Sequence, residues 1–309
     1  MVPGDYCHRA AQRRRGTCGF GDKTIMGKHG RLVSVNTAMT EVRSYRFGIL
    51  GPVVACDSVR FMELGAPRQR AVLAALLVTP GRVVSVDRIM FALWEERCPS
   101  NAMISLQSYV SNLRRILEAD SPPRRRDRIL RRQPPGYVLA IEPTQVDAHL
   151  FEQAVRAGRR LAGEHKFESA IRMLDGGLML WRGSPYEEFG GHRFVGQEII
   201  RLEDLRLTAL EIRCEAQLSL GYELDAVIAE LHRQWAASPT RERLSSLLML
   251  ALCRNGRQAD ALSVFERTRM ALQEEFGVDP GAQLQNLFTS ILRQDDTIFD
   301  STPLRATEQ

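Results

Sequence analysis

The stretch from Ser100 to Leu117, SNAMISLQSYVSNLRRIL, constrains the fold of this chain more than any other segment. Four apolar side chains recur along it at helical spacing, at Leu106, Val110, Leu113 and Leu117. At 100° per residue they fall within about 40° of one another, which predicts a helix with one buried stripe. The opposite face of this helix is polar and basic, so it is free to contact a partner.

Two further helices are predicted upstream. The segment APRQRAVLAALL has an apolar stripe and is followed by a Pro-Gly pair, which ends a helix. The segment VDRIMFALWEE follows Ser85, a residue type favoured at helix N-caps, and is broken by Pro99. Before both helices, Gly-Pro and Asp-Ser turn signals separate three short predicted strands, at residues 46–50, 53–56 and 59–62.

An arginine-rich hairpin is predicted after the third helix, in the segment RILRRQPPGYVLAI (128–141). Its Pro-Pro-Gly sequence makes a tight reversal, and Tyr137 starts the returning strand. Arginines on such a hairpin neutralise phosphates and fit the narrow minor groove of DNA. A helix pair, a basic helix and a basic hairpin are what a protein needs to read a DNA groove and hold the adjacent backbone.

The candidate DNA contacts lie on the polar face of the third helix and in the hairpin. Asn pairs bidentately with adenine and Arg with guanine, and small polar side chains let a helix enter the major groove. Ile104 is apolar, so it either contacts a thymine methyl group or packs under a neighbouring loop. An ordinary solvated surface, with an inert solvated hairpin, is the alternative interpretation. The predicted contacts are Asn101, Ile104, Ser108, Tyr109, Ser111, Asn112, Arg114 and Arg115 on the helix, and Arg128, Arg131, Arg132, Gln133 and Tyr137 in the hairpin.

Charge divides the chain into a basic part and an acidic part. Residues 41–141 contain 16 basic and 9 acidic residues, whereas residues 142–309 contain 19 basic and 26 acidic residues. Residues 1–40 add 7 basic and 2 acidic residues. This division favours a nucleic-acid surface in the first part and a different role in the second.

Four segments are expected from these patterns. Residues 1–40, rich in Gly, Arg and Thr, are expected to be a disordered basic extension, with Met1 or Met39 as the translation start. Residues 41–141 form a first domain of short strands and three helices. Residues 147–293 form a nearly all-helical second domain, and residues 294–309 are a flexible tail.

The second domain contains recurring helix pairs. Three similar segments place an alanine at the same relative position, at Ala170, Ala226 and Ala261. The spacing of 35 residues between Ala226 and Ala261 is close to the tetratricopeptide period, whereas the spacing of 56 between Ala170 and Ala226 is not. We therefore expect a helical-repeat domain with irregular spacing, and repeats of this kind present a concave surface to partners or to each other.

Several classes of protein are not supported by the sequence. It contains no GxSxG, HExxH or P-loop motif, and its six cysteines form no CxxC or zinc pattern, so no enzyme, cofactor or metal site is expected. No apolar run of about 18 residues and no secretory signal is present, so no membrane contact is expected. The expectation is a cytoplasmic, nucleoid-associated protein with reduced thiols.

In this order, the segments resemble the Streptomyces antibiotic regulatory protein family. RFGILGPV, GAPRQRAVLAALL, VVSVDRIMFALW, SLQSYVSNLRRIL and PPGYVL are similar to the OmpR-type winged helix. VDAHLFEQAVRAGRRL, LWRGSPYEEF and EEFGVDPGAQLQNL are similar to the family's bacterial transcriptional activation domain. The resemblance implies an α+β winged helix-turn-helix domain followed by an all-α, tetratricopeptide-like domain, and it identifies the chain as a small member of the family.

The resemblance also implies a function. Such proteins activate transcription of secondary-metabolite (antibiotic) gene clusters, bind direct repeats upstream of promoters and often bind as side-by-side protomers. The implied partners are double-stranded promoter DNA, the sigma-factor region of RNA polymerase holoenzyme and, on DNA, a second copy of the chain. The helix 101–117 matches the family's recognition helix, and the hairpin matches its wing, although Gln133 stands where the family often has Arg.

The loop before the recognition helix faces the polymerase in OmpR-type activators. The matching residues here are Glu95, Glu96 and Arg97, where the family often has an acidic residue and two prolines. The alternative function is a helical-repeat adaptor that binds a protein or peptide and uses the winged helix only for docking. DNA binding distinguishes the two.

Overall fold

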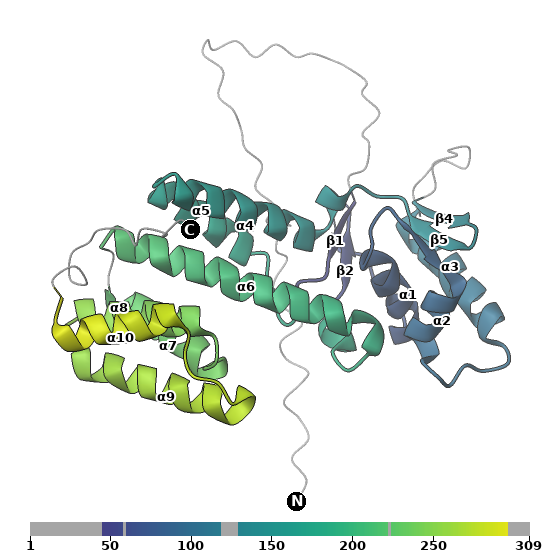
Figure 1. The fold of residues 1–309 in the computed structure, drawn as a ribbon. Coiled ribbons are helices and arrows are strands. Elements are labelled where there is room, and N and C mark those ends of the chain that lie inside the picture. The colour runs from purple at the N-terminus through teal and green to yellow at the C-terminus, as the bar shows by residue number, and fades with distance from the viewer. Residues whose placement is uncertain (1–44, 58–59, 119–128, 222–223, 296–309) are drawn as a thin grey trace, which may run out of the picture. The chain divides into compact units, whose positions relative to one another are not determined.

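The computed structural model describes residues 45–57, 60–118, 129–221 and 224–295 (Figure 1). The chain divides into two compact units. Of the described residues, the first unit comprises those of 45–48 and 53–146, and the second comprises those of 49–52 and 147–295. The expected second domain thus also includes four residues from the middle of the expected first domain. The extension 1–40 and most of the tail, 296–309, lie outside the described residues.

The first unit opens with a two-stranded antiparallel sheet of β1 (Arg46–Gly48) and β2 (Val54–Cys56). The strand expected at 59–62 is wrong as far as this segment is described: Phe61 forms only an isolated bridge to Cys56. The side chain of Asp57 explains this difference, because its Oδ1 accepts a hydrogen bond from the Arg60 amide at 2.8 Å and turns the chain.

Three helices follow, as expected: α1 (Pro67–Leu77), α2 (Val86–Trp94) and α3 (Ala102–Leu117). Ser85 is confirmed as the N-cap of α2, since its Oγ accepts a hydrogen bond from the Arg88 amide at 3.3 Å. The stripe predicted for α3 is also confirmed: its four residues are all buried, and Ala102 joins them. α1 packs against both α2 and α3, so the stripe closes the core of the unit.

The hairpin belongs to a three-stranded antiparallel sheet in the order β3-β5-β4. β4 (Leu130–Gln133) and β5 (Gly136–Leu139) form the hairpin, and β3 (Val83–Ser85) pairs with β5. β3 was not expected, because three residues that end at a helix N-cap are too few to show an alternating pattern. Gly136 permits the pairing, since a Cβ at this position would lie 1.7 Å from the Val84 carbonyl oxygen.

The second unit is helical, as expected. Its described elements are α-helices, apart from a short 3₁₀ turn at Glu187–Phe189. Another 3₁₀ turn, Pro143–Gln145, belongs to the first unit and precedes the first of these helices. The α-helices are α4 (Asp147–Gly163), α5 (Phe167–Leu178), α6 (Arg193–Ser219), α7 (Leu224–Ala237), α8 (Glu242–Arg254), α9 (Gln258–Phe276) and α10 (Ala282–Arg293) (Figure 1). None of the described helices is long and apolar enough to cross a membrane.

The repeat register differs from the expected one at α7. Ala170 and Ala261 are fully buried, and each is the fourth residue of its helix, α5 or α9. In α7, by contrast, Ala226 is exposed and the next residue, Val227, is buried. Val227 and Ala261 are 34 residues apart, which is the tetratricopeptide period. The alanine pattern was therefore misaligned by one residue.

Asp147, the first residue of α4, holds the segment Ile49–Pro52 in the second unit. Its buried carboxylate accepts hydrogen bonds from the amides of Ile49 (2.8 Å) and Leu50 (3.2 Å). Arg182 pairs with the same carboxylate at 3.0 Å and donates its own amide to the Leu50 carbonyl at 2.7 Å. Ile49 and Leu50 are almost completely buried. Burial also raises the pKa of Asp147.

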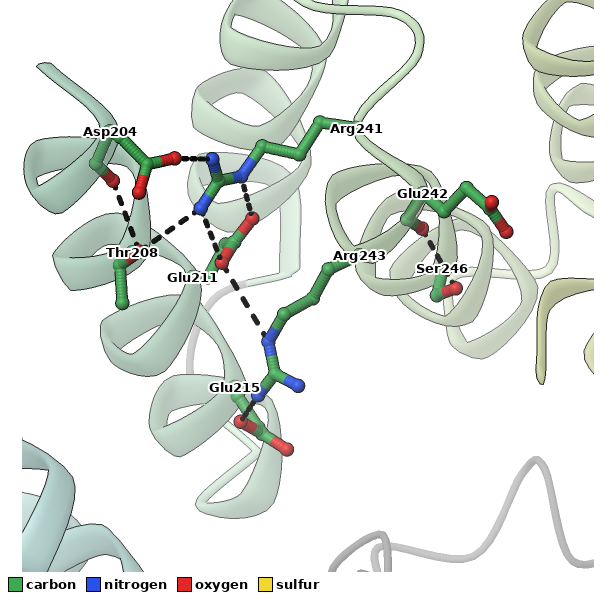
Figure 2. Close-up of polar contacts among 8 residues, drawn as sticks. All are labelled: Asp204, Thr208, Glu211, Glu215, Arg241, Glu242, Arg243 and Ser246. Carbon is green, nitrogen blue, oxygen red and sulfur yellow. Dashed lines mark hydrogen bonds and ion pairs between the residues drawn. The ribbon is translucent and has the colours of Figure 1, made fainter. Parts of the chain in front are cut away.

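A cluster of ion pairs joins α6 to the start of α8 (Figure 2). The carboxylate of Glu211 on α6 is 3% exposed, and Arg241, the N-cap residue of α8, donates to it from Nε at 2.5 Å. Arg241 also donates to Thr208 at 3.0 Å and pairs with Asp204. The Nε of Arg243 lies 3.8 Å from the same buried carboxylate. Glu211 is thus a buried charge with a specific partner.

Candidate nucleic-acid interface

The polar face of α3 is exposed within the first unit. Asn101, Ser108, Ser111 and Arg115 are all exposed, and Ile104 is 67% exposed. Ile104 therefore does not pack under a loop of the described chain, and its contact with a thymine methyl group stays a prediction. The stripe and the polar face lie on opposite sides, as helical periodicity requires.

Two exposed residues of α3 were missed by the sequence analysis. Gln107 is exposed, and Met103 is 42% exposed beside Ile104. Gln107 lies three residues from Ile104, so helical spacing alone places it near the same face. Glutamine pairs bidentately with adenine, as asparagine does. Gln107 thus joins the candidate contacts.

Side-chain hydrogen bonds organise part of this face. The guanidinium of Arg115 donates to Asn112 Oδ1 at 3.3 Å, so these two candidate base-reading groups lie side by side. The hydroxyl of Ser108 donates to the Ile104 carbonyl at 3.1 Å and lies close to the helix backbone. Tyr109 and Asn112 are half-buried on the flanks. The face thus consists mostly of short polar side chains, and Arg115 is the one exposed cationic side chain among residues 101–117.

Arg114 has a different environment from its neighbour Arg115. It is half-buried, and its Nε donates a hydrogen bond to the carbonyl of Leu130 at 3.0 Å. Leu130 is the first residue of β4. Arg114 therefore lies between α3 and the hairpin and connects the two predicted DNA-binding elements.

The hairpin β4–β5, called the wing from here on, presents Arg131, Arg132 and Gln133 as exposed residues of β4. Arg128 lies outside the described residues. Tyr137, across from Arg132 in the register, is only 3% exposed. A residue so buried is not a direct DNA contact in this conformation, so the prediction for Tyr137 needs correction.

Tyr137 instead supports Arg132. The Nη1 of Arg132 donates to the Tyr137 hydroxyl at 3.0 Å, and its guanidinium lies 5.1 Å from the centre of the ring. A cation over an aromatic face is attracted by the ring quadrupole. The sequence could not show this burial, because β5 is the central strand of the sheet only through its pairing with β3, which comes from a distant part of the chain.

The loop between α2 and α3 contains the residues predicted to face the polymerase. Glu95 is half-buried at the C-terminus of α2 and has a positive φ of 51°, whereas Glu96 and Arg97 are exposed. Trp94, which precedes them, is buried, and the guanidinium of Arg68 lies 5.9 Å from its ring. The loop thus starts from a fixed aromatic side chain and presents its charges outward.

No group of three or more His, Cys, Asp or Glu side chains that could hold a metal ion occurs among the described residues. In the same part of the chain, Cys56, Cys98, Cys214 and Cys253 form no disulfide. Desolvation by burial raises the pKa of both Cys214 and Cys253 to about 11. These two side chains therefore pack as small apolar groups rather than as reactive thiolates.

Two protein families match the chain. Residues 63–139, which contain α1 to α3 and the wing, match the C-terminal domain of transcriptional regulatory proteins. Residues 146–292, which run from α4 through α10 to its penultimate residue, match the bacterial transcriptional activator domain. The match thus covers both units.

The relatives found by sequence are regulatory proteins. The transcriptional regulatory protein EmbR of Mycobacterium tuberculosis is 38% identical over 80% of this chain and 63% of EmbR. The regulatory protein AfsR of Streptomyces coelicolor is 36% identical over 84% of this chain but only 25% of AfsR. The regulatory protein DnrI of Streptomyces peucetius is 34% identical over 84% of this chain and 96% of DnrI. The chain thus spans less than two thirds of EmbR and nearly all of DnrI.

A solved structure has the same fold. It is Mycobacterium tuberculosis EmbR in complex with a low-affinity phosphopeptide, with a TM-score of 0.76 and 37% sequence identity. The similarity covers 82% of this chain and 66% of that chain. The winged-helix and tetratricopeptide-like architecture expected from the sequence is therefore confirmed.

Proposed function

Because the chain belongs to the Streptomyces antibiotic regulatory protein family, we propose that it is a sequence-specific DNA-binding activator of transcription. The observation that carries the proposal is the exposed polar face of α3 beside the arginine-bearing wing, both within one compact unit. An α-helix fits the major groove, which is about 12 Å wide, while arginines on a neighbouring strand neutralise backbone phosphates.

The residues of this surface have distinct proposed roles. Asn112 and Arg115, which lie side by side, read base edges in the major groove. Ile104 contacts a thymine methyl group. Arg131 and Arg132 bind phosphates or enter the minor groove. The half-exposed flank of α3 lies beside the sugar-phosphate backbone of the DNA.

Family membership supports finer proposals. The chain regulates a secondary-metabolite (antibiotic) gene cluster and binds direct repeats upstream of promoters as side-by-side protomers. It recruits RNA polymerase through the sigma-factor region, with Glu95, Glu96 and Arg97 as contacts. The exposure of Glu96 and Arg97 supports this last role.

The test is a fluorescence-anisotropy titration of the full chain on labelled promoter fragments from the neighbouring genes, at two salt concentrations and with scrambled competitor DNA. We expect competitor-resistant binding to one fragment, with affinity that falls steeply as salt rises because arginine contacts release counterions. In vitro transcription from that fragment then distinguishes an activator from a repressor.

Equal, weak binding to every fragment would contradict the proposal. It would favour the adaptor alternative, in which the helical repeats bind a protein or peptide and the winged helix only docks. If a DNA fragment is bound tightly but its transcription does not increase, sequence-specific DNA recognition is supported and activation is contradicted.

A further inference from the structure

We propose that Arg114 is a positioning residue, which fixes the wing to α3 and does not itself read bases. This inference rests on the proposed function, because it concerns how the same DNA-binding surface is held together. Its basis is the hydrogen bond from Arg114 Nε to the Leu130 carbonyl at 3.0 Å, which joins residues 16 positions apart.

The Leu130 carbonyl needs a partner from outside the sheet. β4 is an edge strand, since the strand order is β3-β5-β4. The preceding carbonyl, that of Ile129, accepts from the Ala140 amide at 2.6 Å and so points towards the neighbouring strand. Successive carbonyls of a strand point in opposite directions, so that of Leu130 points away from β5, towards the open edge. Arg114 satisfies this edge group.

The bond lies where it can fix the geometry of the interface. Leu130 is fully buried, and Leu113 and Leu117 of α3, which flank Arg114 along the helix, are buried as well. A hydrogen bond from a charged donor is stronger than a neutral one, and partial burial protects it from water. The start of the wing is therefore held at a set distance from the polar face of α3.

Binding DNA through two elements at once costs less when their relative position is already fixed. Without the bond, the wing can shift along α3, and its arginines meet the backbone less often when α3 is in the groove. The expected loss is in affinity for all sequences. The pattern of preferred bases should remain, because the residues that read bases, Asn112 and Arg115, keep their places on α3.

Two variants separate the hydrogen bond from the charge. Arg114→Gln places an amide nitrogen, Nε2, where arginine has Nε, so it keeps the donor and removes the charge. Arg114→Met has similar length and no donor. We expect Arg114→Gln to bind the specific fragment within about twofold of the unmodified chain and Arg114→Met to bind roughly tenfold more weakly.

A double-mutant cycle tests whether Arg114 acts through the wing. In a background with Arg131→Ala and Arg132→Ala, the additional effect of Arg114→Met should shrink to about twofold, because the wing no longer contributes the contacts that Arg114 positions. The matched control is Arg115→Ala, whose effect should add to that of the wing variants. Thermal unfolding followed by circular dichroism verifies that each variant is folded.

Hydrogen exchange without DNA gives an independent measurement. Amides of β4 and β5 should exchange faster in Arg114→Met than in Arg114→Gln or the unmodified chain, while amides of α1 stay unchanged. The positioning role is overturned if exchange in the wing is unaltered, if Arg114→Gln binds as weakly as Arg114→Met, if the cycle is additive, or if Arg114→Met relaxes the preference at one base pair. If the unmodified chain prefers no fragment, the proposed function fails, and the role of Arg114 in DNA binding fails with it even where exchange responds.

Discussion

At the scale of single residues, neighbouring arginines of α3 have different environments. Arg115 is exposed beside Asn112, so it is the arginine of this pair that can reach a guanine. Arg115→Ala should weaken specific binding by about 1–3 kcal/mol and relax the preference at one base pair. Anisotropy titrations against fragments with each base pair changed in turn measure both effects. Unchanged affinity and preference would remove Arg115 from the base-reading surface.

Tyr137 offers a second residue-scale prediction. Tyr137→Phe removes the hydroxyl that accepts from Arg132 but keeps the buried ring. We expect severalfold weaker binding to all sequences, with stability lowered by about 1 kcal/mol or less, because one partly buried hydrogen bond is lost. In comparison, Arg132→Ala should also flatten the slope of log affinity against log salt by about one. A Tyr137→Phe variant with unaltered affinity would show that the hydroxyl does not position Arg132.

At the scale of elements, close packing of α4 against α5 depends on one of two adjacent glycines. A Cβ at Gly177 would lie 2.8 Å from that of Ala154, whereas a Cβ at Gly176 has nothing within 4 Å. Gly177→Ala should therefore destabilise the chain by about 1–3 kcal/mol through overpacking. Gly176→Ala should stabilise it by up to about 1 kcal/mol, since alanine favours helix. Urea midpoints that shift in the same direction would contradict this account.

The ion-pair cluster between α6 and α8 gives another matched pair of variants. Arg241→Ala leaves the buried carboxylate of Glu211 without its nearest cation, and we expect a loss of about 2 kcal/mol in the free energy of unfolding. Arg243 is 54% exposed, so Arg243→Ala should cost less than about 1 kcal/mol. Chemical denaturation of both variants decides the matter. If Glu211→Gln does not reduce the cost of Arg241→Ala, the unpaired charge is not its cause.

Elements whose signal is local could be predicted from the sequence. The stripe of α3, the Ser85 cap and the Pro-Pro-Gly reversal depend on residues within a few positions of one another. β3 could not be predicted, because it depends on pairing with β5. The isolated bridge at Phe61 could not be predicted either, because it depends on the turn that the Asp57 side chain makes. The repeat register failed for a related reason: alanine and valine fill equivalent buried positions in α7 and α9.

At the scale of the whole molecule, the helical unit is incomplete without Ile49–Pro52. A fragment that begins at residue 147 lacks the two amides that donate to Asp147 and the buried side chains of Ile49 and Leu50. Its free energy of unfolding should be at least about 2 kcal/mol lower than that of the same unit in the full chain. Urea unfolding followed by tryptophan fluorescence tests this, with Trp94→Phe in the full chain so that only the helical unit reports. Equal midpoints would mean that the segment adds no stability.

The residues of the candidate site could be proposed from the sequence, but the surroundings of each side chain could not. Sequence periodicity placed Ile104 and Arg115 on one face, and the structure exposes both. The same periodicity could not show that Arg114 bonds to the wing, because its partner Leu130 lies 16 positions further along the chain, outside the helix. Similarly, the apolar run at Ile49 is typical of a strand, and its place is decided by Asp147, 98 residues away.

The path of the chain passes between the two units after Gly48, after Pro52 and again after Val146. A genetic exchange with one breakpoint near residue 146 would therefore combine a helical unit from one parent with a four-residue segment from the other. In such a hybrid the buried carboxylate of Asp147 keeps its hydrogen bonds only if the four residues from the other parent offer amides at the same positions and apolar side chains of matching shape. Regulators of this architecture are thus expected to be inherited as two-unit pieces, and successful hybrids to carry the short segment along with the helices it completes.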